Sequence, residues 1–140
     1  MSDVNLRVAA KAAIFYKNKV LILREANTYK DGTNIGKYGL VGGRVNPEES
    51  FFDALAREVK EETGLKVDVV KPVYVGEWWP NIKGQKSHIV AVFVLCNAHT
   101  NKVVLSDEHD DYKWVDAKKL PEFSMVEPDR TVTEQVLNET

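Results

Sequence analysis

Residues 43–65, with the sequence GRVNPEESFFDALAREVKEETGL, constrain the fold more than any other part of this chain. Ser50 and Asp53 have the spacing of a capping box, which predicts a helix beginning at about Phe51. Gly64 suits the position after a helix, so the helix is expected to end near Thr63. Apolar residues at helical intervals predict the face of this helix that packs on a core: Phe51, Phe52, Leu55 and Val59.

The same helix carries three carboxylates, Glu58, Glu61 and Glu62, at positions i, i+3 and i+4. Like charges at this spacing cost a few tenths of a kcal/mol per pair. Negative charge in the last turn is also disfavoured by the helix dipole. A solvated acidic face, balanced by Arg57 and Lys60, is one interpretation. The other is a metal site, because clustered carboxylate oxygens suit Mg²⁺ or Mn²⁺ beside substrate phosphates.

The full pattern of this stretch decides between the two interpretations. It resembles the Nudix box, whose defining positions are occupied here by Gly43, Glu49, Arg57, Glu58, Val59, Glu61, Glu62, Gly64 and Leu65. The resemblance implies an α/β fold, a Nudix-type α/β/α sandwich with a central mixed β-sheet. It also implies that Glu58, Glu62, Glu61 and the Gly43 carbonyl hold Mg²⁺, with Mn²⁺ as the alternative. Glu49 and Arg57 are then expected to pair and to orient the metal ligands.

Length and composition limit the remaining possibilities. A chain of 140 residues predicts one domain over residues 1–140. The net charge is −2, and no basic run predicts binding to a nucleic-acid duplex. The single Cys96 lies in an apolar run and is expected to be a buried thiol in a reducing compartment. No apolar run approaches the length of a membrane span, so a cytoplasmic protein without membrane contact is expected.

Before the box, residues 8–15 and 20–23 read as two strands of a hairpin. Arg24 closes the second strand, where it either reaches toward substrate or is an exposed charge. Residues 25–37 lack periodicity and predict a long loop. Tyr38 leads into the double glycine at a position where the Nudix family commonly has Trp. This departure places Tyr38 among the candidate substrate-binding residues.

After the box the chain is rich in strand-forming residues. Residues 66–70 and 73–79 predict one long or bent strand interrupted at Pro72, and the apolar residues 88–96 predict a central strand. One of Trp78 and Trp79 is expected in the core. The other, with Trp79 as the candidate, either stacks on a substrate base or contacts a second copy in a homodimer. A C-terminal helix is expected from Glu127 or Pro128, with its apolar stripe at Val132, Val136 and Leu137.

An acidic loop at residues 106–111 precedes an aromatic-rich strand at residues 112–115. The Nudix resemblance implies that a glutamate here reaches the metal site from across the cleft. Glu108 is the candidate, with Asp110 and Asp111 as alternatives and a solvated acidic turn as the competing interpretation. His109 is a further candidate for general base, since some family members use a loop histidine in that role.

These features predict a metal-dependent pyrophosphohydrolase whose substrate is a nucleoside diphosphate linked to another group. The proton of the attacking water is expected to pass to Glu58, Glu61 or Glu108. A short chain without an added recognition domain favours a nucleoside triphosphate, oxidised or pyrimidine, as the small-molecule substrate. ADP-ribose, a sugar nucleotide and a dinucleoside polyphosphate remain alternatives, as does a nucleotide-binding regulatory module without turnover.

Overall fold

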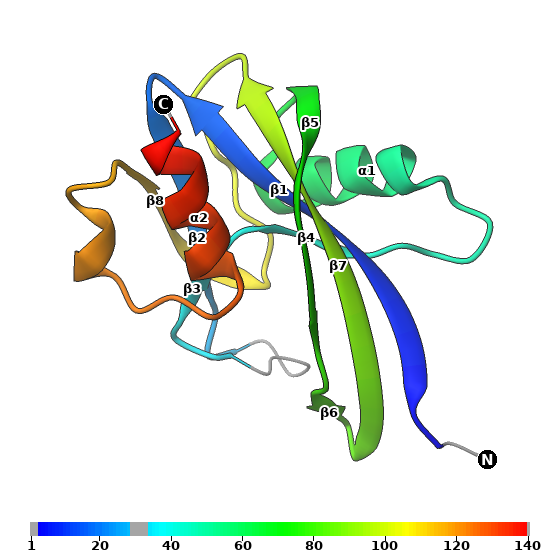
Figure 1. Ribbon diagram of the computed structural model, residues 1–140. Coiled ribbons are helices and arrows are strands. Elements are labelled where there is room, and N and C mark those ends of the chain that lie inside the picture. The colour runs from blue at the N-terminus through cyan, green and yellow to red at the C-terminus, as the bar shows by residue number, and fades with distance from the viewer. Residues whose placement is uncertain (1–2, 29–33, 140) are drawn as a thin grey trace.

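The computed structural model of the protein describes residues 3–28 and 34–139. In these residues, strands come first, one helix follows the double glycine, and a second helix closes the chain (Figure 1). The elements are β1 (Asn5–Tyr16), β2 (Lys19–Glu25), β3 (Tyr38–Gly39), β4 (Val41–Arg44), α1 (Phe51–Thr63), β5 (Val67–Trp78), β6 (Asn81–Ile82), β7 (Gln85–Ala98), β8 (His109–Val115), a 3₁₀ turn (Leu120–Glu122) and α2 (Asp129–Asn138).

The strands form one mixed sheet with the order β3-β2-β1-β7-β5, in which β4 also pairs with β1, β6 with β7 and β8 with β2. The long central pair β1 and β7 is parallel, in register from Asn5 beside Ser87 to Phe15 beside Asn97. The other strand pairs are antiparallel. The predicted central strand is therefore confirmed as β7, which lies between β1 and β5.

Two apolar clusters lie on opposite faces of this sheet. On one face, Leu55 and Val59 of α1 pack with sheet residues that include Ile14 and Val94. On the other face, α2 packs its buried residues Val132, Val136 and Leu137 on a cluster that includes Phe15 and Phe93. Figure 1 shows the two helices on opposite sides of the sheet. The α/β fold with a mixed sheet between helices is confirmed.

The predicted limits of α1 are confirmed at both ends. The Ser50 side chain accepts a hydrogen bond from the backbone N–H of Asp53 at 3.1 Å, which satisfies one free donor of the first turn. Gly64 has φ 71° and donates its N–H to the Lys60 carbonyl. The expectation for Phe52 is wrong, because its side chain is 51% exposed. It packs edge-on against Phe51, at the rim of the core.

The long strand predicted after the box is present as β5. β5 runs through Pro72 as one bent strand, with shifts in its pairing on β7 between Val69 and Lys71 and between Pro72 and Tyr74. Part of the predicted loop, residues 29–33, lies outside the described residues, as do residues 1–2 and 140 of the predicted domain.

Burial raises the pKa of the Cys96 thiol to about 12, as suits a cysteine packed among apolar side chains.

Candidate functional site

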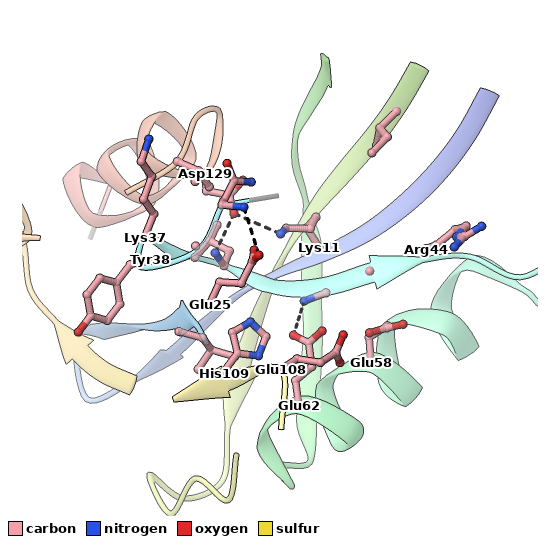
Figure 2. Close-up of a pocket in the computed structure, with 18 of the residues that line it drawn as sticks. Lys11, Glu25, Lys37, Tyr38, Arg44, Glu58, Glu62, Glu108, His109 and Asp129 are labelled. Atoms are coloured by element: carbon pink, nitrogen blue, oxygen red, sulfur yellow. Dashed lines mark hydrogen bonds and ion pairs between the residues drawn. The ribbon is translucent and has the colours of Figure 1, made fainter. Parts of the chain in front are cut away.

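Helix α1 and strand β4 bring two carboxylates against the double glycine. The backbone N–H of Gly42 donates to the Glu62 carboxylate at 3.1 Å. A Cβ placed on Gly43 would lie 2.7 Å from the Glu58 carboxyl carbon, so the missing side chain is what lets Glu58 approach the backbone. Figure 2 shows Glu58 and Glu62 projecting from α1 toward β4. The predicted approach of Glu58, Glu62 and Gly43 is therefore present in the fold.

Glu62 is the buried one among the three glutamates of α1. Its side chain is buried, at 5% exposure, and this desolvation raises the pKa of Glu62 well above its usual value. The Gly42 N–H and the positive charge of Lys11 act in the opposite direction, while the neighbouring Glu58 raises the pKa further. No salt bridge joins Glu62 to a lysine or arginine among the described residues. A buried carboxylate in this state favours a proton or a cation beside it.

Arg57 connects the loop before α1 to the acidic face of the helix. Its Nε and Nη2 donate to the two Glu49 carboxylate oxygens at 2.8 and 3.0 Å, a bidentate pair. Its Nη1 donates to Glu58 at 2.9 Å and to Glu61 at 3.3 Å, and Nη2 also reaches the Arg44 carbonyl. The hydrogen bond from Arg57 lowers the pKa of Glu49. The geometry expected of the Glu49–Arg57 pair is observed, and its catalytic role remains a prediction.

These groups open into a cavity of about 500 Å³ between α1, β4 and the start of α2. Lys11 of β1 borders this cavity, and its Nζ lies 3.2 Å from the buried Asp129 carboxylate. Asp129 also accepts a hydrogen bond from the Leu40 N–H at 2.8 Å. Figure 2 shows this pair on the far side of β4 from Glu58 and Glu62. Among the described residues, six carboxylates border the cavity: Glu25, Glu58, Glu61, Glu62, Glu108 and Asp129.

The donor set fits a hard divalent cation, although the side chains are not gathered around one. Within the described residues, no group of three or more His, Cys, Asp or Glu is arranged to hold a metal ion. Glu58 and Glu61 instead accept hydrogen bonds from the Arg57 guanidinium. Oxygen donors, a buried carboxylate without a salt bridge and a close glycine backbone are nevertheless the chemistry that Mg²⁺ prefers.

The acidic loop reaches the same cavity through Glu108 and His109. The Glu108 carbonyl accepts a hydrogen bond from the Ala26 N–H at 2.9 Å, which ties the loop to the end of β2. The buried Nδ1 of His109 has no hydrogen-bond partner among the residues that the structure describes, and burial lowers the pKa of the imidazole. The alternatives Asp110 and Asp111 are engaged elsewhere, with Arg24 and with the Tyr38 hydroxyl. Of the loop acids, the structure brings Glu108 to the cavity.

The three candidate substrate-binding residues are not brought together. Arg24 does not border the cavity, and its Nε pairs with Asp110 at 2.7 Å. Tyr38 borders it, but its hydroxyl donates a hydrogen bond to Asp111, and Figure 2 shows the Tyr38 ring pointing away from Glu58 and Glu62. Trp79 is 55% exposed and stacks on His88 at 4.5 Å, outside the cavity. Substrate roles for Arg24 and Trp79 remain predictions that this geometry does not favour.

Sequence reasoning missed Lys11 and Asp129 as residues of this cavity. The signal for Lys11 was its position as the one charged residue in the apolar segment VAAKAAIF. Asp129 gave a weaker signal, since an acidic residue in the first turn is common in helices. The sequence does not predict that Lys11 and Asp129 pair, because 118 positions separate them (129 − 11).

The sequence of the protein matches a known domain family over nearly its whole length. The family model described as the NUDIX domain matches residues 5–136. The chain belongs to the Nudix hydrolase family. The chain is similar, at low identity, to relatives with named activities. A nucleoside triphosphatase NudI of Klebsiella pneumoniae (strain 342) is 27% identical over 100 residues, 64% of this chain and 69% of that protein. An ADP-ribose pyrophosphatase of Methanocaldococcus jannaschii is 27% identical over 118 residues, 84% of this chain and 66% of that protein.

Solved Nudix structures agree with the fold. A MutT protein from Methanosarcina mazei Go1 superposes with a TM-score of 0.79 and 26% identity, covering 99% of this chain and 97% of that one. A MutT Nudix hydrolase from Burkholderia pseudomallei has the same TM-score with 27% identity, covering 94% of this chain and 98% of that one. No helix within the described residues of our Nudix protein is long and apolar enough to cross a membrane.

Proposed function

We propose that this Nudix protein is a Mg²⁺-dependent pyrophosphohydrolase that converts a nucleoside triphosphate to a nucleoside monophosphate and pyrophosphate. The observation that carries the proposal is the buried Glu62 carboxylate, held by the Gly42 N–H beside Glu58 in an acidic cavity. An uncompensated buried charge is costly in a scaffold and useful in a cation site. The name of the NudI relative supports a triphosphate substrate.

The residues that would hold the metal are Glu58, Glu61 and Glu62, with the Gly43 carbonyl. Mg²⁺, or Mn²⁺ in its place, supplies positive charge against phosphate oxygens and makes a water more acidic when bound. Glu49 fixes the Arg57 guanidinium through two hydrogen bonds, so Arg57 is positioned to orient Glu58 and Glu61. The role of this pair is to set the direction of the ligand oxygens.

The proton of the attacking water needs an acceptor in the cavity. Glu58, Glu61 and Glu108 are the candidates, because all three border the cavity. His109 is the other candidate, and the lowered pKa keeps its imidazole neutral and able to accept a proton near neutral pH. The proton leaves the water oxygen as the new oxygen–phosphorus bond forms, and the electron pair of the broken anhydride goes to the departing pyrophosphate.

A nucleotide panel with and without metal tests this proposal. Nucleoside triphosphates, including oxidised and pyrimidine ones, should yield monophosphate and pyrophosphate with Mg²⁺ and nothing in excess EDTA, as measured by chromatography of the products. ADP-ribose, a sugar nucleotide and a dinucleoside polyphosphate complete the panel as alternative substrates. Glu62→Gln should lower the rate by at least about a hundredfold. The substitution removes a metal ligand, and a missing or misplaced metal removes positive charge at the reacting phosphates. Glu122→Gln, at an exposed acid outside the cavity, is the matched control.

Two results would contradict the proposal. Release of only the terminal phosphate would place the attack outside the diphosphate linkage. Hydrolysis that continues unchanged in chelator would remove the metal from the mechanism. Binding of nucleotides without turnover of any of them would instead favour the regulatory-module alternative.

A further inference from the structure

A second cavity, of about 560 Å³, adjoins the cavity that Glu58, Glu61 and Glu62 border, which we call the acidic cavity. Lys11, Gly42, Gly43 and Arg44 border both, and the two glycines place no side chain between them. We call this second cavity the basic arm. It extends along β1 and β7 toward the β6 hairpin, an end of the sheet that Figure 1 shows extending past both helices.

Strand pairing shows which residues lie at the floor of this cavity. Residues directly paired across neighbouring strands project from the same face. Ala9 of β1 pairs with Ala91 of β7, which pairs with Gly76 of β5, so small residues make a shallow row. Arg44 pairs with Ala9 on the other side and stands at the edge of this row. Ala9 borders the cavity with a short side chain, whereas Pro128 and Tyr74 pack over Gly76 at the other end of the row.

The next row along the same face forms the far wall. Arg7 of β1 pairs with Ile89 of β7, which pairs with Trp78 of β5. Two apolar side chains therefore stand beside a guanidinium. Apolar walls lower the local dielectric constant, which strengthens the attraction of an arginine for an anion.

The charges of the two cavities are opposite in sign. Arg7, Lys11, Arg44 and Lys83 border the basic arm, and no aspartate or glutamate among the described residues does so. In the part of the chain that the structure describes, neither the Arg7 nor the Arg44 guanidinium has an ion-pair or hydrogen-bond partner. Two unpaired arginines beside a metal-ligand cavity are suited to phosphate oxygens, which guanidinium groups bind by paired hydrogen bonds.

We propose that the basic arm binds the terminal phosphates of the substrate through Arg7 and Arg44 and thereby selects a triphosphate over ADP-ribose. The inference rests on the proposed function, because it assumes that the bond to be broken lies at the acidic cavity. Beyond that bond a nucleoside triphosphate carries two further phosphates, whereas ADP-ribose carries one phosphate and a neutral ribose. The triphosphate therefore carries more negative charge beyond this bond, and Arg7 and Arg44 of the basic arm would bind it.

Binding of inorganic tripolyphosphate in excess EDTA tests the arm without metal or turnover. Arg7→Gln should weaken this binding by about tenfold, measured by isothermal titration calorimetry, because one charged hydrogen-bonding partner is lost. Arg7→Lys should keep part of the affinity by keeping the charge. The matched control is Lys19→Gln, a lysine at the other end of the sheet, where β1 pairs with β2, and it should bind as the wild type does.

Steady-state rates with Mg²⁺ test the selectivity. Arg7→Gln should raise the KM for a nucleoside triphosphate by about tenfold with kcat nearly unchanged, and should leave kcat/KM for ADP-ribose within about twofold of wild type. An equal loss on both substrates, or an unchanged affinity for tripolyphosphate, would overturn the assignment of the arm while leaving the proposed function standing. A wild type that hydrolyses no nucleotide would overturn the proposed function, and the calorimetry would still decide whether the arm binds phosphates.

Discussion

The charge of Glu62 has opposite effects on the stability of the fold and on the proposed metal site. Its burial and the nearby Glu58 disfavour the negative charge in the metal-free fold, and the proposed metal site requires that charge. Glu62→Gln keeps an oxygen that can accept from the Gly42 N–H and removes the charge. In chelator at pH 7.5 we therefore expect the variant to unfold at the same temperature as wild type or higher, by up to about 1 kcal/mol in stability. With saturating Mg²⁺ the order should reverse, because wild type gains metal-binding free energy.

The sign of the pH dependence follows from the same shift in the pKa of Glu62. A carboxyl whose folded pKa is raised binds more protons in the folded than in the unfolded state, so stability falls as pH rises above the usual value of 4.5 toward the folded pKa. Melting temperatures in EDTA from pH 5 to 8 should thus decline more steeply for wild type than for Glu62→Gln. A variant that melts several degrees lower than wild type throughout would identify Glu62 as a structural anchor.

The Glu49–Arg57 pair predicts a non-additive effect on catalysis. If Arg57 orients Glu58 and Glu61 only while Glu49 holds its guanidinium, the two single substitutions remove the same function. Glu49→Gln and Arg57→Gln should each lower kcat, and the double variant should lose less than the product of the two losses. Circular dichroism should show all three folded. Strictly multiplicative losses would mean that the two residues act independently.

At the scale of the element, β4 contributes two adjacent glycines with different tasks. A Cβ on Gly42, which has φ +143°, would lie 2.2 Å from the Ala10 carbonyl oxygen of the neighbouring strand. A Cβ on Gly43 would instead meet the end of the Glu58 side chain, which can move aside. The first glycine thus preserves strand pairing, and the second preserves the position of a proposed metal ligand.

Alanine at each position should separate these tasks. Gly42→Ala should destabilise the protein by about 2 kcal/mol or more, because backbone must move and the conformation is strained. Gly43→Ala should change stability by less than about 1 kcal/mol and lower the rate by at least about tenfold, since Glu58 is displaced. Thermal melts and rates with Mg²⁺ measure both. A Gly43→Ala variant of full activity would argue against close approach of Glu58 as a catalytic requirement.

At the scale of the whole molecule, the Lys11–Asp129 pair joins α2 to the sheet across the cavity. Asp129 accepts from Leu40 and lies 3.2 Å from Lys11, so one carboxylate holds the start of α2 to both β1 and the chain between β3 and β4. Asp129 is buried, and its Lys11 partner has only 16% of its side chain exposed. Breaking such a pair leaves a poorly solvated charge behind.

Asp129→Asn should therefore destabilise the fold by about 2 kcal/mol, because the Lys11 ammonium loses its ion-pair partner. Adding Lys11→Met should recover part of this loss by removing the unpaired charge. Glu134→Gln on the same helix, at an exposed pair with Arg130, should change stability by less than about 0.5 kcal/mol. Urea unfolding measures all of these variants. A neutral Asp129→Asn variant would show that α2 docks through its apolar face alone.

The sequence by itself determined the limits of α1, and its resemblance to the Nudix box implied the approach of Glu58 and Glu62 to the double glycine and the Glu49–Arg57 pair. Capping and helical spacing act over a few residues, so short-range geometry fixes the limits of α1. Only the tertiary structure decided that Arg24 pairs with Asp110, that Lys11 meets Asp129, and that Arg7 and Arg44 border a basic arm. These contacts depend on strand register and on α2 docking, which join residues far apart in the chain and leave no periodic signal in it.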